Sequence, residues 1–140
     1  MRRLNLIDKA FFLKKSSLFG ALDLELLLSI ADKMESLHYR PEDTVFQPDH
    51  DAQRMYLILS GNLSVIDKRG NQLAELSMGD FFGDESLFNE KRRAYGVFCK
   101  TKVELLSLSR AHLLSIIHEC PSVAISLLET YATQVSFRNR

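Results

Sequence analysis

The stretch FFGDESLFNEKRRAYGV, residues 81–97, places a glycine and two acids shortly before an arginine in a basic run. Gly83 permits a backbone turn that other residues disfavour, and the acids after it favour the start of a short helical turn. Backbone N–H groups at such a turn bind an anion when a cation completes the site. Arg93 is the candidate cation, because its planar guanidinium can hold two oxygens of a phosphate at once. The stretch therefore predicts a focal anion pocket.

The chain as a whole has 140 residues, enough to bury one continuous core without metal or disulfide support. Its formal net charge is +0, so it lacks the global field that draws proteins to nucleic acid or acidic membranes. Cys99 and Cys120 form no CxxC pair, which fits a reducing cytoplasm better than a disulfide scaffold or zinc module. The apolar runs are too short or too interrupted to insert into a membrane. We expect a cytoplasmic single domain, residues 1–140.

The spacing of apolar residues divides the chain into three zones. A helical N-terminus is expected at about 5–37, with Asp23 as a helix cap. At about 38–108, short apolar runs separated by turn signals are typical of a sandwich or barrel. The period becomes helical again at about 109–137, in two helices. We expect Ser109 to cap the first of these, and the Pro121 ring suits the first turn of the second.

The middle zone contains four short apolar runs that predict strands, at residues 44–46, 55–59, 63–66 and 72–76. The pairs Gly61-Asn62 and Gly70-Asn71 fall between successive runs, where a hairpin needs residues that tolerate a positive φ. We therefore expect an antiparallel meander over residues 55–76.

These residues resemble a known family. The run GDFFGDESL at 79–87, followed after five residues by Arg93-Ala94 and by Val97, resembles the phosphate-binding cassette of cyclic nucleotide-binding domains. Such domains occur in the protein kinase A regulatory subunit, the catabolite activator protein and cyclic-nucleotide-gated channels. The resemblance covers about residues 11–135, and the opening FFLKKSSLF is similar to bacterial members. It implies a mainly β fold with flanking helices: an eight-stranded antiparallel jelly-roll-like β-roll, N-terminal helices and two C-terminal helices.

The resemblance also implies a role for each cassette residue. Arg93 would pair with the cyclic phosphate, and Gly83 and Ala94 would add backbone N–H groups. Asp84 would bind the ribose 2′-hydroxyl, with Glu85 as the alternative. The implied ligand site comprises Gly83, Asp84, Glu85, Ser86, Arg93, Ala94 and Tyr95. The family closes its last helix over the base, which assigns a lid to Leu127, Leu128, Tyr131 and Val135.

The cassette also departs from the family pattern. Asp84 is one methylene shorter than the usual glutamate, and Glu85 stands where an aliphatic residue is usual. Tyr95 replaces a small alanine, and it would either crowd the pocket or face outward on a strand. Alternation puts it on the same strand face as Arg93, which keeps crowding open. Ala94 stands where modules that prefer cyclic GMP tend to carry threonine, so the resemblance favours cyclic AMP. Further departures are Arg92 for proline, Gly96 for threonine, and Glu42, Asp49 and Ala52 for turn glycines.

The expected function is therefore a cyclic nucleotide-binding regulatory module for cyclic AMP, with cyclic GMP as the second candidate ligand. It would signal by movement of its C-terminal helix to an effector that the sequence does not identify. The alternative is a degenerate module that binds no nucleotide and acts in protein interaction or assembly.

Several other functions are not expected. No catalytic motif is visible and the four histidines are not paired for a metal, so we expect neither an enzyme nor a metal site. The chain stops just past the last helix, where transcription factors of the family continue into a DNA-reading segment, so no nucleic-acid partner is expected. The last helix also offers a face for a second copy of the chain, and a homodimer is the further candidate assembly.

Overall fold

The computed structural model describes residues 4–87, 89 and 91–133. These residues divide into two compact units. A helical unit takes the described residues of Met1–Lys33 and Ala111–Arg140, and a β unit takes those of Met34–Arg110. The cassette stretch lies in the β unit.

The helical elements are α1 (Leu6–Lys15), α2 (Leu24–Lys33), α3 (Arg110–Glu119) and α4 (Ser122–Thr133). The Asp23 carboxylate accepts a hydrogen bond from the Leu26 amide at 3.0 Å, which confirms the predicted cap of α2. Pro121 was predicted in the first turn of the last helix. It instead lies one position before α4, and its carbonyl accepts from the Ala124 amide at 3.0 Å. No single helix in the described part of the chain is long and apolar enough to cross a membrane; α3 and α4 reach that length only as a pair bent by 116°.

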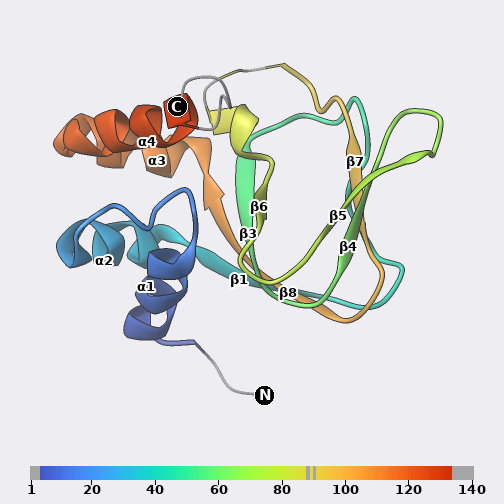
Figure 1. The fold of residues 1–140 in the computed structure, drawn as a ribbon, viewed down its shortest axis with the longest axis horizontal. Helices are drawn as coiled ribbons and strands as arrows, with labels where there is room; N and C mark the ends of the chain where they lie inside the picture. The colour runs from blue at the N-terminus through green and yellow to red at the C-terminus, as the bar shows by residue number, and fades with distance from the viewer. Residues whose placement is uncertain (1–3, 88, 90, 134–140) are drawn as a thin grey trace. The chain divides into compact units, whose positions relative to one another are not determined.

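Eight strands make up the β unit: β1 (Glu35–Tyr39), β2 (Thr44–Phe46), β3 (Arg54–Ser60), β4 (Leu63–Ile66), β5 (Gln72–Leu76), β6 (Phe81–Phe82), β7 (Gly96–Cys99) and β8 (Val103–Ser109). They form two four-stranded sheets, in the orders β1-β8-β3-β6 and β2-β7-β4-β5 (Figure 1). Every pairing is antiparallel, which confirms the predicted β-roll. The four predicted runs are β2 to β5. β1 begins at Glu35, before the predicted zone boundary at residue 37.

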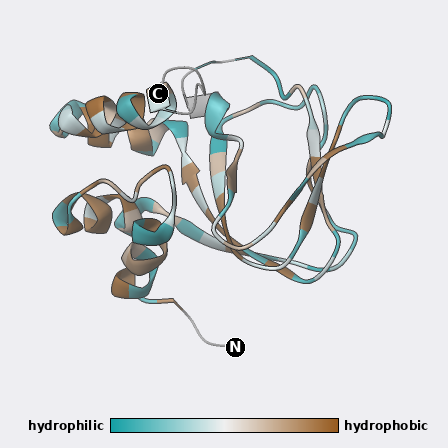
Figure 2. Cartoon of the chain, viewed as in Figure 1, coloured by the Kyte–Doolittle hydropathy of each residue, from teal (hydrophilic) through white to brown (hydrophobic). Residues whose placement is uncertain are grey.

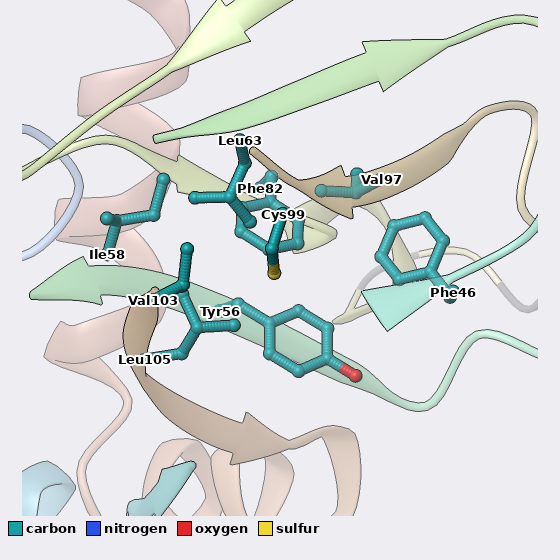
Figure 3. Close-up of a cluster of buried hydrophobic side chains, with 9 residues drawn as sticks. All are labelled: Phe46, Tyr56, Ile58, Leu63, Phe82, Val97, Cys99, Val103 and Leu105. Carbon is teal, nitrogen blue, oxygen red and sulfur yellow. The ribbon is translucent and has the colours of Figure 1, made fainter. Parts of the chain in front are cut away.

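The core of the β unit lies between its two sheets, and both sheets contribute to it (Figure 3). Its buried members are Phe46, Tyr56, Ile58, Leu63, Phe82, Val97, Cys99, Val103 and Leu105. The Tyr56 and Phe82 rings stack with centroids 5.0 Å apart, a geometry that adds to the gain from burial. Hydrophobic residues follow the strands, whereas the loop between β4 and β5 is hydrophilic (Figure 2). Beside the exit from β8, the Arg110 amide donates to the Gln53 carbonyl at 2.8 Å.

The predicted meander is only partly formed. β4 and β5 pair as a hairpin around Gly70, which has φ +86°, so the turn at Gly70-Asn71 is confirmed. The hairpin at Gly61-Asn62 is wrong, because β3 pairs with β6 and β8 and β4 pairs with β5 and β7. Gly61 has φ +97°, and a Cβ there would collide with the Lys102 carbonyl oxygen. Its missing side chain lets the chain pass closely over the β7–β8 connection as it moves from one sheet to the other.

Two turns use a non-glycine residue at positive φ. Glu42 has φ +73° and Asp49 has φ +69°, and these are two of the three positions at which the sequence lacks the family's turn glycines. The third, Ala52, is buried at 4 % exposure and is not among the positive-φ residues of the described chain. A residue with a Cβ strains the backbone when its φ is positive.

We expect Glu42→Gly to stabilise the protein by about 0.5–1 kcal/mol, because glycine relieves the left-handed strain at an exposed site and loses part of that gain to unfolded-state entropy. Asp51→Gly is the matched control: Asp51 is exposed and lies outside the positive-φ set, so this change should destabilise slightly. Urea unfolding of the three proteins measures both effects. Equal effects of the two substitutions would contradict the assignment of strain to Glu42.

Candidate functional site

The candidate site forms where β6 ends. Gly83 follows Phe82 with φ +75°, and Asp84–Leu87 form a single 3-10 turn, η1, so the predicted glycine turn and helical turn are confirmed. A Cβ on Gly83 would lie 2.9 Å from Arg93 Nη1 and 3.1 Å from the Arg54 carbonyl oxygen. Only a residue without a side chain lets the guanidinium come this close to the turn.

Arg93 is the central side chain of this site and is 3 % exposed. Its Nη1 donates to the Gly83 carbonyl at 3.0 Å and its Nη2 to the Arg54 carbonyl at 2.5 Å. The guanidinium carbon lies 4.1 Å from the centre of the Phe46 ring, within the range of a cation–π contact. Its Nε is buried and has no hydrogen-bond partner among the described residues. The guanidinium thus faces the Gly83 turn rather than bulk water, and its Nε donor is unused among the described residues.

The turn contains two acidic residues, Asp84 and Glu85. The Glu85 carboxylate is 3.4 Å from Arg93 Nη1, and its side chain is 49 % exposed. Asp84 is half-buried. Glu85 thus contacts the cation at the edge of solvent, where the ion pair contributes little to stability.

Tyr95 completes the site from the segment that leads into β7. Its hydroxyl accepts a hydrogen bond from the Gly83 amide at 3.0 Å, and its ring lies 5.5 Å from the Phe46 ring. Burial raises the pKa of the Tyr95 phenol well above its ordinary range, and the negative charge of the nearby Glu85 carboxylate raises the pKa further. Tyr95 thus turns toward the Gly83 amide that the resemblance assigns to the ligand. The expected strand alternation of Arg93 and Tyr95 is wrong, because both residues lie in the irregular segment before β7.

A hollow of about 150 Å³ lies beside these groups, and its lining includes Ala52, Glu85, Arg92, Arg93, Ala94 and Tyr95. It brings together four of the seven predicted ligand residues. Gly83 joins them through its contacts with Arg93 and Tyr95. The side chain of Ser86 lies outside the described residues.

Sequence reasoning missed two partners of the guanidinium, the Phe46 ring and the Arg54 carbonyl. Both come from strands far upstream of the cassette, β2 and β3, and a backbone carbonyl leaves no mark in the residue pattern. The spacing rules used for the cassette are local, so they carry no signal for either contact.

The predicted lid residues lie on α4, in the other unit. Leu127 is buried at 1 % exposure, whereas Leu128 is 63 % exposed, and Tyr131 is half-buried. Val135 lies outside the described residues. Within the described part of the chain, no group of three or more histidine, cysteine or acidic residues is placed to hold a metal ion.

A family model described as "Cyclic nucleotide-binding domain" matches residues 36–120, which include the whole candidate site. Among curated proteins, the chain is 24% identical over 131 residues to a CRP-like cAMP-activated global transcriptional regulator of Mycobacterium tuberculosis, covering 91% of this chain and 58% of the regulator. It is 32% identical over 106 residues to the Drosophila melanogaster cGMP-dependent protein kinase, isozyme 1, covering 71% of this chain and 14% of the kinase. The chain thus spans little more than half of the mycobacterial regulator and a small part of the kinase.

Two further matches are a channel subunit and a solved structure. The alpha subunit of the rod photoreceptor cyclic nucleotide-gated channel of Gallus gallus is 28% identical over 134 residues, covering 91% of this chain and 21% of the channel. Among solved structures, the N-terminal domain of a transcriptional regulator from Streptomyces coelicolor superposes with a TM-score of 0.82 at 27% identity. That match covers 91% of this chain and 94% of the solved domain.

We expect the burial of the Tyr95 phenol to make stability fall in alkaline solution. The folded-state pKa of the phenol is raised above its ordinary value of 10.0, so its contribution is complete below pH 10 and is lost as pH rises through the folded-state pKa. Between about pH 10 and 11.5, wild-type stability should fall more steeply than that of Tyr95→Phe, by up to about 1.4 kcal/mol per pH unit. Denaturant titrations at several pH values measure the two slopes. Identical slopes would mean that the phenol ionises as in the unfolded chain.

Proposed function

Because this chain belongs to the cyclic nucleotide-binding domain family, we propose that its β unit binds a cyclic nucleotide in the hollow beside Arg93 and acts as a regulatory module. The observation that carries the proposal is the buried guanidinium of Arg93, whose Nε has no partner among the described residues. A buried donor without a partner costs about 1–3 kcal/mol, and a phosphate oxygen would recover that cost. The Glu85 carboxylate that pairs with this cation is half-exposed, so a negatively charged ligand can compete with it for the guanidinium.

The size of the hollow indicates how much of the nucleotide the β unit covers. At about 150 Å³ it is smaller than the roughly 300–1,000 Å³ of pockets that enclose a whole small molecule. We infer that the phosphate and sugar occupy it, with the phosphate on Arg93 and the Ala94 amide and the sugar beside the acidic turn of Asp84 and Glu85. The base would then extend beyond the hollow.

The exposed base leaves a role for the last helix. We propose that α4 closes over it and that this movement is the signal, since a ligand shifts an equilibrium only through its different affinity for the two states. Of the predicted lid residues, Leu127 is already buried and Leu128 is 63 % exposed, so Leu128 is the better candidate for a new apolar contact. In this proposal the signal passes to an effector, and no residue of the chain is assigned to contact it.

We propose cyclic AMP as the preferred ligand. The names of the relatives divide between the two nucleotides, with cAMP in that of the mycobacterial regulator and cGMP in that of the Drosophila kinase. Ala94 supports cyclic AMP, because its methyl group offers no hydroxyl to meet a guanine and it lines the hollow.

The contacts within the site also favour a second function. Arg93 already donates to two carbonyls of its own chain, and Tyr95 already accepts from Gly83. A module whose polar groups are satisfied internally can retain the fold without a ligand. The alternative is therefore a β-roll that binds no nucleotide and acts in protein interaction or assembly.

Thermal unfolding with added nucleotide tests the proposal. At a hundredfold excess over its Kd, a ligand adds about 2.7 kcal/mol, which for a chain of this size raises Tm by roughly 5–10 °C. We expect this shift with cyclic AMP, and a smaller one with cyclic GMP at the same concentration. Absence of any shift at millimolar nucleotide would contradict the proposal and favour the module that binds no ligand.

Substitution of Arg93 tests where the nucleotide binds. We expect Arg93→Lys to weaken cyclic AMP binding by about tenfold or more, because lysine keeps the charge but loses the planar fork. Isothermal titration calorimetry well below Tm separates this loss from any loss of stability. Arg69→Ala is the control, because it removes a positive charge from the exposed turn between β4 and β5, and it should bind as wild type does. Equal affinities of Arg93→Lys and wild type would place the phosphate elsewhere.

A further inference from the structure

Arg93 Nη1 donates to two acceptors at the turn. It reaches the Gly83 carbonyl at 3.0 Å and the Glu85 carboxylate at 3.4 Å, because a terminal guanidinium nitrogen carries more than one N–H donor. The bond to the carboxylate is longer than is usual for an N–H···O hydrogen bond. The same carboxylate also lines the hollow beside Arg93. A negative group of the protein therefore already lies at the cation, at the edge of the hollow proposed for the phosphate.

The two partners of this ion pair differ in their freedom to move. The side chain of Arg93 is 2 % exposed and that of Glu85 is 49 % exposed. The guanidinium is also held by the Arg54 carbonyl, at 2.5 Å from Nη2, and by the face of the Phe46 ring, at 4.1 Å. A half-exposed carboxylate has water as an alternative partner. An anion that enters the hollow would therefore displace Glu85 and leave Arg93 in place.

Other charged residues lie around the hollow in more exposed positions. Lys91 and Arg92 line it as well, and both are exposed, so salt screens their charges. Arg92 is 4.0 Å from Asp51, whose side chain is 88 % exposed. Among the described residues, Arg93 is the one charged side chain that is buried. Because a charge acts more strongly where water is excluded, the partner of Arg93 has the largest effect on anion binding.

A phosphate can replace the carboxylate without a change of net charge. A cyclic phosphodiester and a carboxylate are both monoanions, so the exchange leaves the charge beside Arg93 as it was. The carboxylate cannot remain at the guanidinium, because two like charges a few ångströms apart repel each other in a medium of effective dielectric constant about 20. The affinity for the ligand is therefore reduced by whatever the pair of Glu85 and Arg93 contributes to the empty site.

We propose that Glu85 is an internal competitor for the phosphate: its carboxylate occupies a donor of Arg93 in the empty site and moves into solvent when the nucleotide binds. The module then responds to a higher nucleotide concentration than the same turn with an uncharged residue at position 85 would. Glu85 takes no part in binding the sugar, which is left to Asp84. This inference rests on the proposed function, because it concerns the affinity of the same site.

The test is isothermal titration calorimetry with cyclic AMP on the wild type, Glu85→Gln and Asp51→Asn. Glutamine keeps the length of the side chain and removes its charge. We expect Glu85→Gln to bind cyclic AMP about three to ten times more tightly than the wild type, since no ion pair has to be broken. Asp51→Asn is the matched control, because it removes the same charge from a carboxylate that pairs with Arg92 in the lining of the hollow. Its affinity should stay within about twofold of the wild type.

A second titration uses inorganic phosphate, which carries neither sugar nor base. NMR signals of the Gly83 amide and of the Arg93 guanidinium follow the binding. We expect Glu85→Gln to bind phosphate more tightly than the wild type does, by a factor similar to that for cyclic AMP, because the competition concerns the phosphate alone.

The outcomes separate this inference from the proposed function. Equal affinities of the wild type and Glu85→Gln for cyclic AMP would overturn the inference and leave nucleotide binding intact. Weaker binding by Glu85→Gln would also overturn it and would place Glu85 at the sugar. An equal gain in Asp51→Asn would overturn it too, since the effect would then be one of general charge. Tighter phosphate binding by Glu85→Gln without binding of nucleotide to any of the three proteins would support the competition and overturn the proposed function. Binding of neither anion would overturn both.

Discussion

The contact between the Arg93 guanidinium and the backbone of Gly83 is the constraint on which the site depends. A buried positive charge is costly unless other groups replace its hydration. Here two carbonyl oxygens, an aromatic face and a half-exposed carboxylate do so. The arrangement requires a residue without a side chain at position 83, since a Cβ there would lie 2.9 Å from Nη1. One glycine thus fixes how closely the turn, β3 and the basic segment approach one another.

The wall of the site and the core of the β unit are the same set of aromatic rings. Phe46 lies beside Tyr56, Phe82 and Tyr95, and it also carries the guanidinium of Arg93 on its face. Packing at native density leaves such rings little freedom. The polar groups of the site are therefore positioned by hydrophobic burial as much as by their own hydrogen bonds.

The sequence predicts the strands and the local turns well because both depend on near neighbours. Apolar runs bounded by proline, acidic or glycine turn residues give β2 to β5, and the substitution of Glu42 and Asp49 for turn glycines agrees with their positive φ. The hairpin at Gly61 was wrong because the choice of a strand's partner is decided by long-range packing, which a glycine and an asparagine do not encode. Strands that are consecutive in sequence are often, but not always, neighbours in a sheet.

The sequence likewise predicts some parts of the candidate site and not others. Gly83 and Arg93 come together as their spacing and the family resemblance imply, whereas the contact of Glu85 with Arg93 was not expected. Tyr95 meets Gly83 from the irregular segment before β7, where strand alternation does not apply. The bond between the Tyr95 hydroxyl and the Gly83 amide could not be read from the residue pattern, since it depends on where the tyrosine ring lies. The Arg54 carbonyl is 39 residues before Arg93, and it is a backbone group common to every residue type.

The hydrogen bond between the Arg110 amide and the Gln53 carbonyl is next to the Arg93 contact along the chain. Gln53 directly precedes Arg54, whose own carbonyl receives Arg93 Nη2. The carbonyl groups of two consecutive residues thus bind Arg93 and the first residue of α3. The proposed phosphate-binding side chain and the point where the polypeptide leaves the β-roll are therefore anchored to neighbouring peptide groups.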